Sequence, residues 1–366
     1  MINKKEEISI YNYLISNDIL LYTQRQGSDI RLFEYPSRGS ILVNGVAGGL
    51  NYFKNGNSII VNDLNDNRYV EIVSGNESIS NQGCSTQIGE GKYYILTYSE
   101  QENKILLDSN FNKLRSLANF PENFYQSIFY DDCLYAVVDN LEHSPKKPRS
   151  MLVKYDIEND SIEKIFDAKE CIWLNEDGIE EVGFIRQLIC GIDDSLIFEV
   201  SKYHIICIDL NSGKKLWEIS DFISNAEQTK YLSYGVSPSS RTPMKWMKDE
   251  KNNKLHLLAR HFYWNLDIMS RKVSMVSDFL DSTLMNRWSI QNTNLVGNEI
   301  LFTGTQGFQS TPNRIGAYDI DSKSIVWEYE LKSGYFRGAP ELIDGHLVVS
   351  DSNSILHVFT KDDQEA

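Results

Sequence analysis

The sequence is poor in long apolar runs and in paired cysteines. None of its 366 residues falls in an apolar stretch that approaches a membrane span, and no such stretch follows the polar start at residues 1–7, as a signal peptide would require. The five cysteines, Cys84, Cys133, Cys171, Cys190 and Cys207, are odd in number and widely spaced. We therefore expect reduced cysteines, most of them small core residues, in a cytoplasmic protein that contacts no membrane.

Positive charge is also scarce. Lys and Arg number 36 against 51 Asp and Glu, which gives a net charge of −15. A polyanion would be repelled by such an acidic surface, so binding to nucleic acid or to an anionic membrane is not expected. The same charge suits solubility and a basic protein partner.

Motifs that carry chemistry are missing as well. The six histidines show no ligand spacing and no two cysteines form a C-x-x-C pair, which argues against zinc. Asp63, Asn65 and Asn67 begin like a calcium loop, but Arg68 stands where that loop needs Gly, and Ser74 where it needs a carboxylate. No Gly-x-Ser-x-Gly occurs. We therefore predict no metal, no cofactor and no catalytic residue.

What the chain does contain is a repeated strand pattern. Near the C-terminus, apolar runs at 339–343, 346–350 and 355–359 are separated by Asp344-Gly345 and by a polar turn. Asp-Gly between β-branched runs favours a hairpin, because both central residues of the favoured turn adopt positive φ. Turn pairs of this kind between apolar runs occur eight times, at Asn17-Asp18, Asn55-Gly56, Glu90-Gly91, Asp131-Asp132, Asp193-Asp194, Asn252-Asn253, Gly297-Asn298 and Asp344-Gly345.

A second marker keeps the same phase along the chain. Tyr155-Asp156, Ile208-Asp209, Leu266-Asp267 and Tyr318-Asp319 each precede a polar hairpin and a fourth strand. Units of four short strands at a spacing of roughly 40–50 residues are the signature of a β-propeller. We predict an all-β fold, a single β-propeller domain over residues 1–366 with eight four-stranded blades, seven being the alternative. Segment 2–14 is expected to close the ring and so protect its edges.

The fourth-strand hairpins carry a family resemblance. Their sequences are Asp209-x-x-Ser212-Gly213-Lys214-x-x-Trp217-Glu218 and Asp319-x-x-Ser322-Lys323-Ser324-x-x-Trp327-Glu328. They resemble the repeat of pyrroloquinoline-quinone-like (PQQ-like) propellers, over residues 184–218 and 289–359. The resemblance implies that Trp217 and Trp327 pack between neighbouring blades. That family includes quinone-dependent dehydrogenases and protein-binding scaffolds, and the adjacent cysteines often found in the dehydrogenases do not occur here.

One face of the predicted ring collects the long connections. In a propeller, the connections between blades and those between second and third strands open on the same face. Long segments of this kind lie at 139–149, 167–183, 221–243, 278–287 and 304–312, and such segments often bind. Ser220-Asp221 and Ser277-Asp278 are expected to cap short helices there, with the following Phe turned inward. The predicted interface residues are Lys146, Lys147, Arg149, Trp173, Glu176, Asp177, Glu180, Glu181, Tyr231, Tyr234 and Arg241.

Three arginines mark the starts of inner strands. Arg186, Arg287 and Arg337 each precede an inner-strand run, which would bring three guanidinium groups to one mouth of the central channel. Arginine suits bidentate recognition of carboxylate or phosphate. The alternative is that these arginines pair with Asp and Glu of neighbouring blades.

These observations favour a non-enzymatic propeller that binds another protein through its long-loop face. An acidic binder of this kind would neutralise a basic effector, such as a bacterial nuclease toxin, in the manner of an immunity protein. The alternative from another class is an enzyme or small-ligand binder of the PQQ-like dehydrogenase type, which would use the channel mouth.

Overall fold

The fold is known from a computed structural model. It describes residues 2–10, 12–16, 19–26, 29–35, 40–43, 50–55, 58–63, 68–73, 76–82, 84–88, 93–97, 104–108, 113–120, 124–139, 150–168, 171–174, 180–200, 204–219, 245–279, 288–307, 311–343 and 345–361. Among residues 2–97, side chains are described only at 7–10, 22, 24, 93 and 95.

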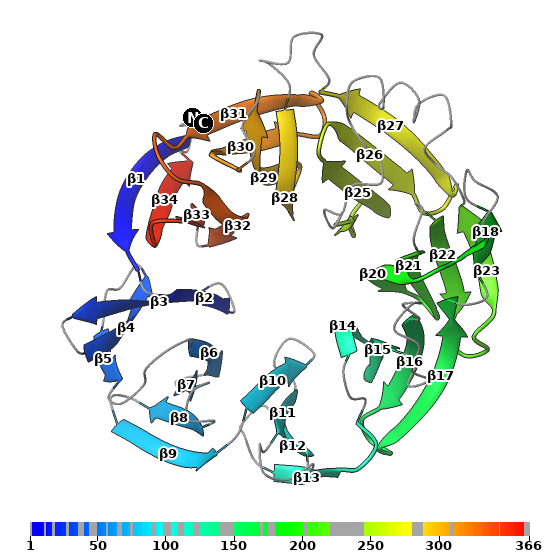
Figure 1. Cartoon of the computed structure of the whole chain (residues 1–366), viewed down its shortest axis with the longest axis horizontal. Coiled ribbons are helices and arrows are strands. Elements are labelled where there is room, and N and C mark those ends of the chain that lie inside the picture. Colours follow the sequence, from blue (N-terminus) through cyan, green and yellow to red (C-terminus); the bar gives the residue numbers. More distant parts are fainter. Residues whose placement is uncertain are drawn as a thin grey trace.

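Eight four-stranded antiparallel sheets stand around one axis and form the ring of a β-propeller (Figure 1). Blades 1 to 4 are formed by β2 (Asn12–Ser16), β3 (Ile19–Gln26), β4 (Asp29–Tyr35), β5 (Ser40–Val43); β6 (Leu50–Asn55), β7 (Ser58–Asp63), β8 (Arg68–Val73), β9 (Asn76–Gln82); β10 (Cys84–Ile88), β11 (Tyr93–Thr97), β12 (Lys104–Asp108), β13 (Lys113–Leu117); and β14 (Phe124–Tyr130), β15 (Cys133–Asp139), β16 (Ser150–Asp156), β17 (Ser161–Asp167). Blades 5 to 7 are formed by β20 (Ile185–Ile192), β21 (Ser195–Val200), β22 (His204–Asp209), β23 (Lys215–Ile219); β24 (Met247–Asp249), β25 (Lys254–Ala259), β26 (Phe262–Asp267), β27 (Lys272–Asp278); and β28 (Trp288–Val296), β29 (Glu299–Gln306), β30 (Arg314–Asp319), β31 (Ser324–Glu330).

Blade 8 joins the two ends of the chain. It contains β32 (Phe336–Ile343), β33 (His346–Asp351) and β34 (Ile355–Lys361), and its outer strand is β1 (Ile2–Ser9). The pairing of β1 with β34 runs from Ile2 opposite Lys361 to Ser9 opposite Ile355. Ile8 and Ile10 are buried in one cluster with Val358 and Tyr22, so the closing strand is packed against blade 1 as well as hydrogen-bonded. The predicted closure by the N-terminal segment is confirmed, and the alternative of seven blades is wrong.

The turns follow the local chemistry of the sequence. The turn pairs that the structure describes in full lie between the first and second strands of their blades, at Asp131-Asp132, Asp193-Asp194, Asn252-Asn253 and Gly297-Asn298. Asp131 and Asp132 have φ of 48° and 56°, as the favoured two-residue hairpin turn requires. Asp209 and Asp319 end third strands, and each carboxylate accepts a bond from the backbone N–H three residues later, at 2.7 and 2.6 Å. Short-range signals therefore determine where each strand begins and ends.

The core lies between the blades. Trp217 packs on a cluster that joins blades 5 and 6, which includes Cys190 and Trp264. Trp327 stacks edge-on against Phe359 of blade 8, with ring centroids 5.3 Å apart. The structural role predicted for the two tryptophans is confirmed, because both cover the face that a single blade would leave exposed.

One expectation about the long connections is wrong, and the parallel one for Ser220-Asp221 falls outside the described residues. Ser277 and Asp278 do not cap a helix, since both belong to strand β27, where the Ser277 hydroxyl bonds that of Tyr318. Phe279 does turn inward, against Tyr318. The long segment 167–183 contains a hairpin of β18 (Ile172–Leu174) and β19 (Glu180–Val182).

Candidate functional site

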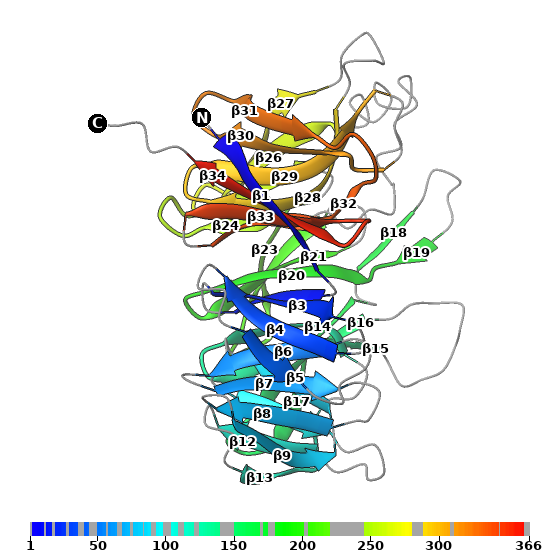
Figure 2. The ribbon, with the colours of Figure 1, turned by 90° about the vertical axis from the view of Figure 1, so that its left-hand side faces the viewer.

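The two faces of the ring differ in what they carry. The first-to-second and third-to-fourth strand turns open on one face, which we call the turn face. The connections between blades and the second-to-third strand loops open on the other, which we call the loop face. Its described parts are residues 10, 118–120, 168, 171–174, 180–184, 245–246, 260–261, 279, 307, 311–313, 331–335 and 352–354. The β18–β19 hairpin projects on this side of the ring (Figure 2).

Most of the predicted interface falls outside the described residues. This applies to Lys146, Lys147, Arg149, Glu176, Asp177, Tyr231, Tyr234, Arg241 and to the channel-mouth residue Arg287. Trp173 and Glu181 lie opposite each other in the β18–β19 hairpin, and Glu180 is exposed at the start of β19. These three residues are therefore on the loop face, as predicted, while their role in binding stays a prediction.

The hairpin is an insertion between blades 4 and 5 with apolar side chains at its base. Ile172 is 58% exposed and Phe184 is 39% exposed. The Cys171 carbonyl accepts a 2.8 Å bond from the Gly183 N–H, which joins the two ends of the hairpin. A Cβ at Gly183 would come within 2.9 Å of Val200, so glycine is needed for the close approach to blade 5. The hairpin is thus held firmly at its base and presents apolar surface to solvent.

Arg186 lies where β20 begins, at the loop-face end of the inner strand. The β20–β21 pairing slips by one residue between Ile185 and Gln187, and Arg186 occupies this bulge. Its Nη1 lies 3.7 Å from Oε1 of Glu199, a carboxylate with no exposed surface. Burial raises the pKa of Glu199 to about 7, while the charge of Arg186 and the nearby Trp246 side chain act in the opposite direction. Arg186 therefore has an acidic neighbour within its own blade.

Gln187, the next residue, links two blades through their backbones. Its side chain accepts a 2.9 Å bond from the Trp246 N–H and donates one of 3.2 Å to the Trp246 carbonyl. Gln126 of blade 4 makes the same pair of contacts with blade 5, to the Leu188 N–H and the Arg186 carbonyl. The inner strands of blades 4 to 6 are therefore fixed relative to one another next to Arg186.

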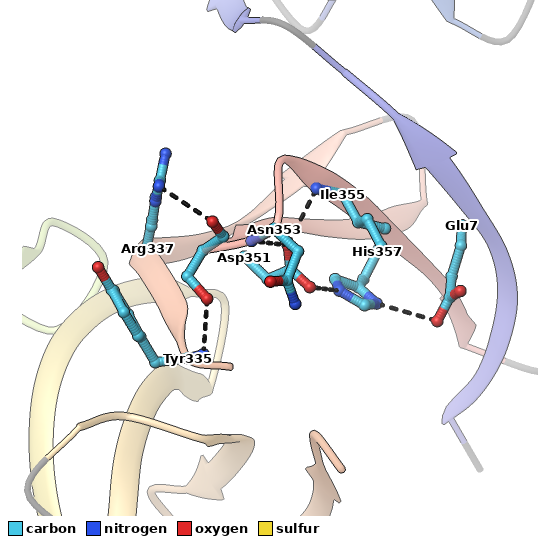
Figure 3. Close-up of polar contacts among 8 residues, drawn as sticks. Glu7, Tyr335, Arg337, Asp351, Asn353, Ile355 and His357 are labelled. Atoms are coloured by element: carbon cyan, nitrogen blue, oxygen red, sulfur yellow. Dashed lines mark hydrogen bonds and ion pairs between the residues drawn. The ribbon is translucent and has the colours of Figure 1, made fainter. Parts of the chain in front are cut away.

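Arg337 occupies the corresponding place in blade 8. It is exposed, and its Nη2 donates a 3.2 Å bond to the Ser352 carbonyl (Figure 3). The Ser352 hydroxyl accepts a bond from the Tyr335 N–H, so two loops of the loop face are joined beneath the guanidinium. The structure therefore places Arg186 and Arg337 at the loop-face ends of inner strands, as predicted. Arg186 lies beside a buried carboxylate, whereas Arg337 bonds a backbone carbonyl.

A polar chain centred on buried Asp351 and His357 runs outward from this point. The Asp351 carboxylate accepts bonds from the N–H groups of Asn353 and Ile355, at 2.8 and 2.9 Å, and from Nε2 of His357 at 2.9 Å. The other ring nitrogen of His357 lies 3.6 Å from Oε1 of Glu7 on the closing strand (Figure 3). His357 is buried, so this chain stabilises the second-to-third strand loop and the last blade.

One further carboxylate was missed in the sequence. Burial raises the pKa of Glu341 on inner strand β32, and Lys245, which precedes inner strand β24 two blades away, acts against that rise. Both Glu199 and Glu341 interrupt strand runs, which was the available signal. Their partners lie 13 residues or two blades away, and no local pattern identifies them.

Metal and membrane chemistry find no support in the described part of the chain. Within it, no group of three or more His, Cys, Asp or Glu side chains is arranged to hold a metal ion. Nor do the described residues include a helix with the length and apolar character needed to cross a membrane.

Comparison with known proteins identifies the fold alone. No protein-family model matches the sequence, and no curated protein matches it. The crystal structure of the computationally designed Ika8 protein is similar, with 11% sequence identity, a TM-score of 0.57 and coverage of 96% of each chain. The β-propeller domain of Cps50 (Swd1) from Myceliophteria thermophila is similar at 12% identity and a TM-score of 0.52, over 97% of this chain and 98% of that one. The shared architecture is that of a β-propeller.

Proposed function

We propose that this chain is a non-enzymatic, protein-binding propeller whose loop face contacts a basic partner. The observation that carries the proposal is the β18–β19 hairpin, which belongs to no blade and exposes Ile172 and Phe184. Apolar side chains held on a rigid base and surrounded by polar groups are typical of protein interfaces. Glu180 supplies an exposed acidic group on the same hairpin.

Charge determines which kind of partner the proposal names. A net charge of −15 attracts a basic protein and speeds its association. An immunity-type inhibitor that covers the active cleft of a basic bacterial toxin would use this attraction. The same proposal places the protein in the cytoplasm, which suits the free thiols of Cys133, Cys171, Cys190 and Cys207. We further propose that the blades are PQQ-like repeats without the quinone cofactor, on the basis of the Trp217 and Trp327 hairpins.

Affinity capture with face-specific variants tests the proposal. The loop-face variant is Ile172→Asp with Phe184→Asp, and the matched control is Met269→Asp, since Met269 is 80% exposed on a third-to-fourth strand turn of the opposite face. We expect a basic protein to be retained by the wild type and by the control, to be lost from the loop-face variant, and to bind more weakly at high salt. Equal capture by all three proteins contradicts the use of this face.

The second candidate is a small-ligand binder or enzyme at the ring axis. Glu341 favours it, because a partly buried carboxylate with a raised pKa on an inner strand is a common feature of ligand sites. A thermal-shift screen against quinones, sugars and phosphorylated metabolites tests this candidate. A shift that is lost in Glu341→Gln supports it, and a basic protein captured as described above with no such shift rejects it.

A further inference from the structure

Blades 7 and 8 form a partly open cavity of about 300 Å³ on the turn face, away from the loop face. Its apolar wall is formed by Val296, Leu301, Leu342 and Leu347. This volume lies at the lower end of the range of small-molecule pockets. The cavity therefore has room for a short aliphatic chain.

The cavity has a clear origin in two positions of the repeat. Val296 directly precedes the first turn of blade 7, and Tyr130 occupies the same place in blade 4. The ring of Tyr130 lies directly over Gly191 of the next blade, where even one added carbon would collide with it. The position of Gly191 is taken by Leu342 in blade 8, since each lies two residues before its turn. An aromatic ring thus fills the seam between blades 4 and 5, whereas the seam between blades 7 and 8 has Val296 in its place.

The polar part of the lining is acidic. Asp319 is held by the Ser322 N–H, 2.6 Å from Oδ1, and by the Asn298 amide, 3.2 Å from Oδ2. These bonds, led by that from the Ser322 backbone, keep the pKa of Asp319 below its ordinary value, so the group is an anion at neutral pH. Glu299 also lines the cavity, and the described lining contains no Lys or Arg. A carboxylate oxygen has two lone pairs, so Oδ2 can accept a further donor.

We propose that this cavity binds a primary aliphatic ammonium group. The methylene chain lies against Val296, Leu301 and Leu347, and the ammonium group donates to Asp319. Such a group occurs on a free alkylamine and on a lysine side chain, and both present the same chemistry to the cavity.

Titration calorimetry with n-pentylamine, n-pentanol and sodium pentanoate tests the proposal. We expect n-pentylamine to bind with a dissociation constant on the order of 1 mM, and the other two at least about tenfold more weakly, because they lack the cation. Asp319→Asn keeps an oxygen that accepts from the Ser322 N–H but removes the negative charge. It should weaken the binding of n-pentylamine at least about tenfold. Asp209→Asn is the matched control, since Asp209 makes the same turn in blade 5 and should leave binding unchanged.

A second variant tests the cavity rather than the charge. The double variant Val296→Tyr, Leu342→Gly places in this seam the same two residue types that Tyr130 and Gly191 provide between blades 4 and 5. The tyrosine ring should fill the cavity and abolish n-pentylamine binding, while the circular dichroism spectrum stays unchanged. Equal binding of n-pentylamine and pentanoate overturns the proposal, and so does binding that survives in Asp319→Asn. Nα-acetyl-lysine amide separates the two sources: affinity equal to that of n-pentylamine assigns the site to a lysine side chain, and weaker affinity assigns it to a free amine.

Discussion

Glu199 is fully buried, and its closest described cationic atom is Nη1 of Arg186, 3.7 Å from Oε1. That distance is longer than a normal hydrogen bond, and neither carboxylate oxygen has a hydrogen bond of good geometry among the described residues. Burial removes water from the Glu199 carboxylate at a large cost in free energy, and the contact with Arg186 offsets only part of that cost. Both effects can be measured.

Glu199→Gln should stabilise the protein at alkaline pH. In the folded chain Glu199 keeps its proton up to about pH 7, whereas its ordinary pKa is 4.5, so the folded state binds more protons between these values. The free energy of unfolding therefore falls as pH rises from 4.5 to 7, by at most about 3 kcal/mol for this group. Urea unfolding at pH 5 and pH 8 checks this. The free energy of unfolding of the variant should exceed that of the wild type at pH 8 and differ little from it at pH 5. Exposed Glu180→Gln should show neither effect.

Arg186 and Arg337 should respond differently to truncation. Arg186→Ala removes the cation beside buried Glu199 and should cost about 3 kcal/mol at pH 8, and less at pH 5, where Glu199 is protonated. Arg337→Ala removes an exposed side chain with one bond to a carbonyl and should change stability by less than about 0.5 kcal/mol. Equal costs in urea unfolding would contradict the distinction. Only Arg337→Ala is then suited to testing partner binding without loss of the fold.

Asp351 should be the most sensitive polar residue of the last blade. Asp351→Ala leaves buried His357 and two partly buried backbone N–H groups without their acceptor, which should cost about 3 kcal/mol. Asp351→Asn keeps an acceptor oxygen and should lose less stability than Asp351→Ala. Chemical denaturation of both variants, with exposed Asp321→Ala as the control, measures the difference. A loss for Asp351→Ala no greater than that of the control would show that the buried chain is dispensable.

Tyr130 and Gly191 should be energetically coupled. Gly191→Ala places a methyl group against the Tyr130 ring and should cost about 1–3 kcal/mol. Tyr130→Ala opens space for that methyl group, so the cost of Gly191→Ala should largely disappear in this background. A double-mutant cycle by urea unfolding gives the coupling energy directly. Additive effects of the two changes would mean that the close packing at this seam does not restrict the glycine.

The candidate site divides into parts that a local pattern reveals and parts that it does not. The apolar run Leu196–Val200 predicts a buried strand, and Glu199 within it is unusual in any sequence. Its partner Arg186 belongs to the preceding strand and reaches it through a bulge. No spacing rule locates that bulge, because it arises where the inner strand adapts to its neighbours.

By itself, the sequence determined the repeated unit. The turn pairs, the Asp209 and Asp319 hairpins and the alternation of apolar residues are short-range features, and short-range backbone chemistry is sufficient to produce four-stranded blades. The tertiary structure alone decided what happens between blades: the register in which β1 pairs with β34, the burial of Glu199, and a cavity beside Val296 where Tyr130 fills the equivalent seam. The physical reason is that such packing depends on side chains from units far apart in the chain, and these meet only when the ring closes.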